Sequence, residues 1–405
     1  MRLLDVSPVD AWPPRRGSAQ RTYNLLKGLA EHHEVRQFCF PQADGRRGLK
    51  RSLDESGMPG GYRRVRLAHP LAGAAVAVGE RAWTRAPILS GLALDLTRPR
   101  VLRELLGWAE VALVSFPWQF RHCARLAENG TPLVYASMNV EAEKFRSWAR
   151  AAGDPALAAP WLQYVERCER RAVRSAALVL AVSEEDRDAF VRRHGADRDR
   201  IAVVPNGADP ESIEPPSPES RRAARARLGL PDRPTAIFVG ADIAPNRCGL
   251  EWVERASRAT DRFTFVVAGK VSRYVTEPNL IALGEIDEVE PLLAAADVAL
   301  CPVEHGGGTK TKLITAMAAG LPSVAFGASV RGTAARDEVH LLSVEPDTRQ
   351  IVAALDRLAD DPALAERLGS AARALVVDRY AWKSIAAQLS ERLESLSPVR
   401  ARQPV

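Results

Sequence analysis

The residues with the clearest chemical pattern lie between Asp297 and Gly320, in the segment DVALCPVEHGGGTKTKLITAMAAG. An apolar run typical of a strand comes first, three glycines follow, and a helical pattern begins near Thr311. Glycine lets the backbone approach a ligand closely, and the free N–H groups at the start of a helix attract phosphate. The pattern predicts a phosphate-binding loop. The alternative is a turn that is merely rich in glycine.

Several residues of this segment are candidate phosphate contacts because they lie in the loop or in the first helical turn. They are Gly306, Gly307, Gly308, Thr309, Lys310 and Thr311, with Lys312 adding positive charge beside them. Gly240 is a further candidate, since it directly follows the strand-like run TAIFV. His305 adjoins the glycines and could act as an acid, but we favour the interpretation that it is a surface histidine without a role.

The elements that must position these residues alternate between strand and helix in both halves of the chain. In the first half, strands are predicted over 2–6, 35–40, 110–114, 132–135 and 177–182, with helices over 21–30 and 160–174. Residues 52–100 fit neither pattern and suggest a mobile or helical insertion. In the second half, strands are predicted over 235–239, 263–267, 298–302 and 323–325, with helices over 250–258, 289–296, 312–319 and 382–396.

This alternation predicts an α/β fold of two doubly wound, Rossmann-like domains, with a boundary at Pro205. A chain of 405 residues exceeds what one core usually supports. Such domains bind ligands at the carboxyl ends of their strands, so we expect a ligand in a cleft between them. Fold alone does not define a reaction.

Composition favours a cytoplasmic protein. Hydrophobic residues make up 46% and charged residues 26% of the chain, which is typical of globular proteins. The N-terminus has no signal-peptide pattern, and no apolar stretch is long enough to span a bilayer. The five cysteines are scattered, which suits a reducing compartment.

Positive charge is concentrated in the first half of the chain. Residues 1–205 carry 32 Lys and Arg against 23 Asp and Glu, whereas residues 206–405 carry 24 against 27. One interpretation is attraction to an anionic partner, either a membrane surface or a phosphorylated acceptor. The other, which we favour, is an arginine-rich solvated surface, because the arginines are dispersed. No nucleic-acid-binding motif accompanies the charge.

Seven segments, in order, resemble motifs of the family-4, or group 1, glycosyltransferases. They are PPRRGSAQR, SMNVEAEKF, LVLAVSEEDRDAF, VVPNGAD, FVGADIAPNRCGLEWV, LGEIDEVEPLLAAADVAL and the glycine-rich segment, with YAWKS resembling the start of the family's C-terminal helix. Each motif alone is weak, but together they cover nearly the whole chain.

The resemblance implies the GT-B fold and a retaining transfer of a sugar from a nucleoside-diphosphate-sugar, with no bound cofactor. Residues 1–205 would form the acceptor-binding domain, with the helix over 382–396 packing back on it, and residues 206–381 the donor-binding domain. The acceptor would be a small molecule or linked to a lipid, and the basic first domain could contact a membrane.

Site residues follow from matching motif positions. Arg247 and Lys310 would stabilise the leaving diphosphate, and Gly17 and Thr315 would contact the donor. Acceptor contacts would come from Ser18, Arg21, Ser115, Asn139 and Glu141. Glu141 is equally well explained as an acid favoured at a helix N-terminus. Trp118 and Phe120 could stack on a sugar, or they are simply buried.

The chain departs from the family pattern at several of these positions. Gly307 and Thr315 replace two glutamates, Ser115 and Met138 stand where histidine is usual, and Ala241 replaces one of two diphosphate-binding cations. Retaining transfer demands little acid–base chemistry from the protein, because the departing diphosphate can take the acceptor's proton. No D-x-D pair suggests a metal, so we expect metal-independent transfer. The alternatives are a degenerate GT-B protein that binds nucleotide or a partner transferase, and a nucleotide-sugar epimerase.

Overall fold

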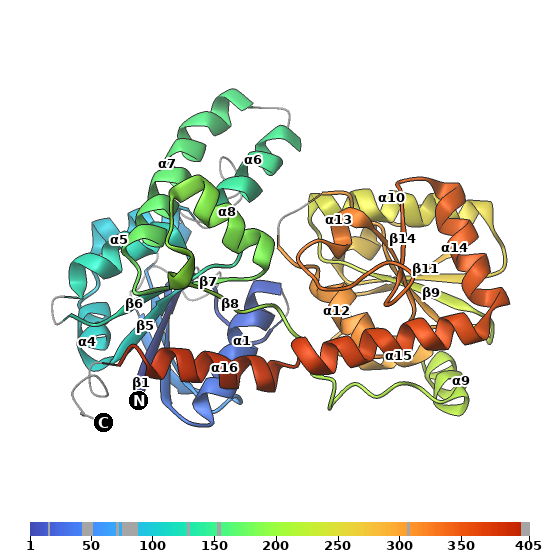
Figure 1. Ribbon diagram of the computed structural model, residues 1–405, viewed down its shortest axis with the longest axis horizontal. Helices are drawn as coiled ribbons and strands as arrows, with labels where there is room; N and C mark the ends of the chain where they lie inside the picture. The colour runs from blue at the N-terminus through green and yellow to red at the C-terminus, as the bar shows by residue number, and fades with distance from the viewer. Residues whose placement is uncertain are drawn as a thin grey trace. The chain divides into compact units, whose positions relative to one another are not determined.

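The computed structural model describes residues 1–14, 17–42, 52–69, 73–74, 88–127, 130–151, 155–305 and 308–397. The chain forms two compact units, each built around its own sheet (Figure 1). The first unit comprises Met1–Pro205 and Ile385–Val405, and the second comprises Asn206–Ser384.

The first unit contains an eight-stranded sheet in the order β3-β4-β2-β1-β5-β6-β7-β8. Its strands are β1 (Arg2–Ser7), β2 (Glu34–Gln42), β3 (Ser52–Gly57), β4 (Arg63–Ala68), β5 (Val111–Val114), β6 (Leu133–Ala136), β7 (Leu178–Ala181) and β8 (Ile201–Val203). All neighbours are parallel except β3 and β4. The chain moves outward from β1 in both directions, so the strand order reverses between β1 and β5.

The helices of this unit are α1 (Gly17–Ala30), α3 (Leu89–Thr97), α4 (Arg100–Trp108), α5 (Pro117–Leu126), α6 (Glu141–Ala151), α7 (Pro155–Ser175) and α8 (Glu184–His194). Most of them cover the sheet by burying an apolar face on it, whereas α6 packs against α7. The C-terminal helix α16 (Trp382–Glu394) joins this unit from Ile385 onward. It lies against α1, where a side chain at Gly28 would clash with Ala386 and where His33 bonds the Ser390 hydroxyl at 2.6 Å.

The predicted strands of the first half are confirmed, but the mobile or helical insertion expected over 52–100 is wrong for its first part, while residues 89–97 are helical. Residues 52–57 and 63–68 form the antiparallel hairpin β3–β4 at the sheet edge, and α3 and α4 follow it. The hairpin was missed because strand β3 (SLDESG) has little apolar character, and much of its stability comes from pairing with β4.

The second unit contains six parallel strands in the order β11-β10-β9-β12-β13-β14. The strands are β9 (Thr235–Val239), β10 (Thr264–Ala268), β11 (Leu280–Gly284), β12 (Val298–Cys301), β13 (Ser323–Phe326) and β14 (Leu342–Val344). This is the strand order of dinucleotide-binding Rossmann domains, with its switch point between β9 and β12. Strands β9, β10, β12 and β13 are almost entirely buried, as expected for parallel strands covered on both faces.

The helices of the second unit lie on both sides of its sheet. They are α9 (Pro218–Arg227), α10 (Ala244–Ala259), α11 (Glu290–Ala295), α12 (Thr311–Ala318), α13 (Gly327–Val330), α14 (Thr348–Asp360) and α15 (Pro362–Arg379), with a 3₁₀ turn η3 (Lys270–Tyr274). Helix α10 begins six residues before the predicted start at Leu250, because Pro245 suits a first helical turn. Helices α14 and α15 and strands β11 and β14 were not predicted.

Candidate functional site

The loops that follow β9 and β12 meet at the switch point of the second unit. The loop after β9 begins at Gly240, whose N–H donates to Ala268 and whose carbonyl accepts from Val271. A side chain at Gly240 would press on Val271 at 2.8 Å. Gly269 has φ +86°, and a side chain there would clash with the Gly240 carbonyl. Glycine at these two positions therefore lets the ends of β9 and β10 pack closely.

The loop after β12 leads into α12, as the sequence predicts. Gly308 adopts φ +67°, a backbone conformation that favours glycine. Thr309 is buried, and its hydroxyl accepts a hydrogen bond of 2.5 Å from the Asn206 side chain. This bond fastens the loop, and the donor contact expected of Thr309 stays a prediction. Gly306 and Gly307 lie outside the described residues, and His305 is exposed.

Helix α12 begins at Thr311 with no side chain capping its N-terminus. The first backbone N–H groups of such a helix have no partner within the helix. Thr311, Lys312 and Thr315 lie on its partly exposed face, whereas Leu313, Ile314 and the residues after Thr315 are buried. Thr315 therefore does not face the core, and it lies one turn beyond Thr311 on the same side.

Lys312 is a cation that the structure holds in place at this switch point. Its ammonium group donates to the Asn246 Oδ1 at 2.7 Å and lies 4.4 Å from the ring centre of Phe238. Asn246 is fixed in turn, because its Nδ2 donates to the Ala241 carbonyl at 2.8 Å. Within the described chain, no carboxylate lies within ion-pair distance of Lys312. Although the residue is partly exposed, desolvation of its ammonium group lowers the pKa of Lys312 to about 8.

Arg247, the other predicted cation, has a different environment. Its guanidinium forms an ion pair of 2.6 Å with Asp242 and stacks on Tyr274 at 4.5 Å. Asp242 also pairs with Arg273 at 2.6 Å and accepts from the Tyr274 hydroxyl. Although desolvation acts in the opposite direction, Arg247 and Arg273 hold the pKa of Asp242 below its usual value. Much of the charge of Arg247 is therefore already compensated. Sequence reasoning missed Asp242, which follows β9 within three residues.

Lys310 is the N-cap residue of α12, and its ammonium donates to the Gly308 carbonyl at 3.3 Å. It therefore remains beside the loop, as the sequence predicts. Together, Lys310, Lys312 and the start of α12 place positive charge at the carboxyl ends of the central strands β9 and β12. An anionic group such as phosphate is the ligand that this arrangement favours.

In the first unit, α1 begins at Gly17, with Gly17 exposed and Ser18 partly exposed at its N-terminus. Arg21 has a structural role that its sequence position did not reveal. Its guanidinium is buried and donates to the carbonyls of Val204 and Pro205 at 2.7 and 2.8 Å. Desolvation lowers the pKa of Arg21 to about 10, with Asp186 acting against it. These guanidinium donors hold the backbone in place, and the acceptor contact expected of Arg21 stays a prediction.

Ser115 follows β5 but does not reach solvent. It is 1% exposed, and its hydroxyl donates to Asp5 at 3.3 Å. Asp5 also accepts from Gln37, and burial raises the pKa of Asp5 to about 6 against these two hydrogen bonds. The acceptor contact expected of Ser115 likewise stays a prediction. Trp118 and Phe120 are buried as well, which confirms the simpler interpretation of these aromatic residues.

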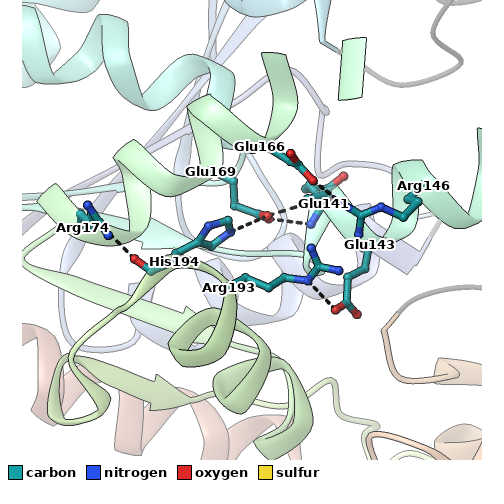
Figure 2. A network of polar contacts seen from close by, with 9 residues as sticks. Glu141, Glu143, Arg146, Glu166, Glu169, Arg174, Arg193 and His194 are labelled. Carbon is teal, nitrogen blue, oxygen red and sulfur yellow. Dashed lines mark hydrogen bonds and ion pairs between the residues drawn. The ribbon is translucent and has the colours of Figure 1, made fainter. Parts of the chain in front are cut away.

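Asn139 and Glu141 lie side by side at the start of α6, where Asn139 Nδ2 donates to Glu141 Oε1 at 3.1 Å. Glu141 is 3% exposed. Its backbone N–H and that of Ala142 donate to the carboxylate of Glu169, at 2.6 and 3.3 Å (Figure 2). Glu169 also accepts from His194 at 3.0 Å. Burial raises the pKa of Glu169, and the bond from His194 opposes this. Glu169 therefore caps α6 and fixes the positions of Asn139 and Glu141. Sequence reasoning missed this residue.

Among the described residues, no group of three or more His, Cys, Asp or Glu side chains could hold a metal ion. No described helix is both long enough and apolar enough to cross a membrane.

The fold is that of an α/β protein with two Rossmann-like units, and comparison with known families agrees. Residues 16–207 match the glycosyl transferase 4-like domain, and residues 233–361 match the glycosyl transferases group 1 domain. The chain belongs to the group 1 glycosyltransferases of GT-B fold.

Relatives with known names include the D-inositol 3-phosphate glycosyltransferase of Streptomyces bingchenggensis. It is 29% identical over 303 residues, which span 68% of this chain and 64% of the relative. The 2-deoxystreptamine glucosyltransferase of Streptomyces kanamyceticus is 30% identical over 49% of this chain and 55% of the relative. The match thus spans less than two thirds of the length of these relatives.

Solved structures share the fold over nearly the whole chain. Sucrose-phosphate synthase from Thermosynechococcus elongatus superimposes with a TM-score of 0.76 at 18% identity, covering 98% of this chain and 99% of that protein. Anabaena HepE, solved in complex with UDP and glucose, gives a TM-score of 0.70 at 16% identity, covering 98% and 100%. At these identities the likeness shows the fold.

Proposed function

We propose that this protein transfers a sugar from a nucleoside-diphosphate-sugar to a small-molecule or lipid-linked acceptor, with retention of configuration. The second unit binds the donor and the first binds the acceptor. One observation carries the proposal: at the β9–β12 switch point, a glycine loop, an uncapped helix start and Lys312 converge. Family membership and the UDP bound by HepE support it.

In this proposal, the donor diphosphate lies at the start of α12, between Lys310 and Lys312. The acceptor oxygen forms a bond to the anomeric carbon as the bond from that carbon to the diphosphate breaks. The acceptor's proton passes to the departing diphosphate oxygen. The protein therefore supplies orientation and stabilisation of developing negative charge. Arg247 contributes less to this charge stabilisation, because its guanidinium already forms an ion pair with Asp242.

Nucleotide screening tests the proposal directly. Thermal shifts are measured with UDP, GDP, ADP and dTDP, and then with their sugars. A ligand that binds only the native state raises the melting temperature. One nucleoside diphosphate should stabilise the chain well above the others, and its sugar should be consumed when an acceptor is present. No stabilisation by any of the four would contradict the donor site.

A second candidate is a nucleotide-binding protein without transferase activity. Two observations favour it: the buried Ser115 leaves no acid or base at the position where the family carries histidine, and Thr315 replaces a glutamate. This candidate predicts nucleotide stabilisation without consumption of any donor sugar. Product analysis across a panel of acceptors distinguishes it from the transferase.

We predict that transfer activity survives EDTA. Cations and a helix start, rather than a metal, would neutralise the diphosphate, and the described residues offer no metal-binding cluster. Initial rates are compared after dialysis against EDTA and after addition of Mg²⁺ or Mn²⁺. Complete loss with chelator that either metal restores would contradict this prediction.

We predict that Thr315→Glu keeps the fold and tightens nucleoside binding by about 1 kcal/mol. A carboxylate there can accept from both ribose hydroxyls, whereas threonine offers one oxygen. Because Thr315 lies on the partly exposed face of α12, the added charge should not be buried without a partner. Calorimetric titration and a melting curve check both parts. A variant that melts early yet binds nucleotide normally would place Thr315 outside the site.

A further inference from the structure

The carboxyl edge of the first sheet carries apolar side chains at its switch point between β1 and β5. Val9, Phe116 and Met138 each lie two residues beyond the last residue of β1, β5 or β6. These three strands are neighbours and run parallel. Phe116 belongs to a buried apolar cluster, and Val9 and Met138, which are partly exposed, pack against that cluster. We call these three residues the strand-end surface.

Helix α7 adds partly exposed apolar side chains to the same cluster: Trp161, Leu162 and Tyr164. The helix ends at Ser175, shortly before β7 begins, so its C-terminus lies at the amino edge of the sheet. Trp161 precedes this end by about four turns, which span about 21 Å. A strand of four residues, such as β7, spans about 13 Å. The first half of α7 therefore reaches the carboxyl edge, where the strand-end surface lies.

The polar groups at this edge bond within the protein. Three serines, at the last residue of β1 and directly after β5 and β6, are at most 1% exposed: Ser7, Ser115 and Ser137. Their hydroxyl groups bond the Val9 N–H, the Asp5 carboxylate and the Leu180 carbonyl, at 3.1, 3.3 and 2.8 Å. Asp10 pairs with Arg64 at 2.8 Å, and Asn139 bonds Glu141. Among the described residues at these three strand ends, the charges and hydroxyl groups are thus already engaged.

This environment selects against a strongly polar ligand. Hydroxyl or phosphate groups that lose water on such a surface need new hydrogen-bond partners, and those that find none weaken binding. An apolar ring gains free energy from the same contact because it leaves water. Ring faces also pack well on methionine and aromatic side chains.

We propose that the strand-end surface binds the hydrophobic body of an uncharged acceptor, an aromatic or alicyclic ring system that carries the accepting hydroxyl group. This inference rests on the proposed function, in which the first unit binds the acceptor, and it names the class of that acceptor. The position suits the role, since ligands of doubly wound sheets bind at the carboxyl ends of strands beside the switch point. Trp161 and Tyr164 of α7 provide further ring contacts.

The test is calorimetric titration of the full chain, without donor, using four probes: naphthol, its saturated analogue decalol, glucose and a glucose phosphate. Naphthol and decalol should bind with a negative change in heat capacity, the mark of apolar burial. Glucose and its phosphate should not bind measurably. Binding of either sugar more tightly than naphthol, or no binding of naphthol, would overturn the proposal.

Substitutions at Met138 locate the binding. Met138→Gln should bind naphthol about 10-fold more weakly, because the ligand would displace water from an amide. Met138→Leu should bind like the parent, since it keeps an apolar side chain. Melting curves establish that both variants are folded. A naphthol affinity in Met138→Gln equal to that of the parent would overturn the assignment to this surface.

Met58→Gln is the matched control, because it makes the same change at another partly exposed methionine of the first unit. Met58 lies on the turn between β3 and β4. Since β4 begins at Arg63 and runs parallel to β2, this turn lies at the amino edge of the sheet. Met58→Gln should bind naphthol like the parent. An equal loss in both glutamine variants would show that binding is unrelated to the strand-end surface.

Product analysis with the donor separates this inference from the proposed function. Naphthol binding that depends on Met138, without consumption of any donor sugar, would contradict the transferase and leave a site for hydrophobic ligands. Transfer to glucose or its phosphate, with none to naphthol or decalol, would overturn the acceptor class and leave the transferase standing.

Discussion

Replacing Lys312 with methionine should weaken the binding of a nucleoside diphosphate by about 10- to 100-fold, the range expected for one hydrogen bond to a charged group. Lys312 donates to Asn246 and lies over Phe238, and no described carboxylate compensates its charge. Methionine keeps most of the packing over Phe238 and removes only the ammonium group. Calorimetric titration of the parent and the variant, with melting curves for both, measures the loss.

The pH dependence of binding identifies the group responsible. Because the pKa of Lys312 is lowered to about 8, its charge is lost as the pH rises above that value. Nucleotide affinity of the parent should therefore fall above about pH 8, and the Lys312→Met variant should lack this fall. In the free chain the folded pKa lies below the unfolded value of 10.5. Between about pH 8 and 10.5 the unfolded chain still holds the proton that folded Lys312 has lost. The free energy of unfolding should therefore rise with pH over this range.

Arg247→Met is the matched control, since it removes a cation from the same switch point. Because Asp242 already pairs with Arg247, we expect a smaller loss of affinity than for Lys312→Met and no change in the pH profile. A larger loss for Arg247→Met would show that the exposed arginine, and not Lys312, holds the diphosphate.

Replacing Glu169 with alanine should destabilise the first unit by about 3–5 kcal/mol, because each buried hydrogen-bond donor left without a partner costs about 1–3 kcal/mol. Glu169 is fully buried, and its carboxylate accepts from His194 and from two backbone N–H groups of α6. Alanine leaves all three donors without a partner and opens a cavity. Denaturant unfolding gives the free energy, and hydrogen exchange in α6, α7 and α8 localises the loss to this unit.

Glu166→Ala on the same helix is the control for this prediction. Glu166 is partly exposed and pairs with Arg146, so its removal should cost less than about 1 kcal/mol. Glu169→Gln should fall between the two, because the amide retains one oxygen as an acceptor. Equal stability of Glu169→Ala and Glu166→Ala would contradict the capping role.

The sequence by itself determined the architecture of the buried parts. Strand β9 was predicted at its observed bounds, because a short apolar run rich in β-branched and aromatic residues and followed by glycine has few alternatives. The start of α12 at Thr311 was predicted equally well from the glycines before it. Seven weak motifs in a fixed order were enough to indicate the family. The hairpin β3–β4 was not predictable in this way, since pairing rather than composition stabilises it.

Only the tertiary structure decided which candidate side chains are available to a ligand. Arg21 donates to carbonyls more than 180 residues away, and Ser115 bonds Asp5 across 110 residues. Arg247 pairs with Asp242, whereas Lys312 is fixed by an asparagine 66 residues earlier. Local patterns predict where a strand ends or a helix begins, because backbone preferences act over a few residues. The free charge at a site depends on partners that folding brings from distant segments, which no local pattern encodes.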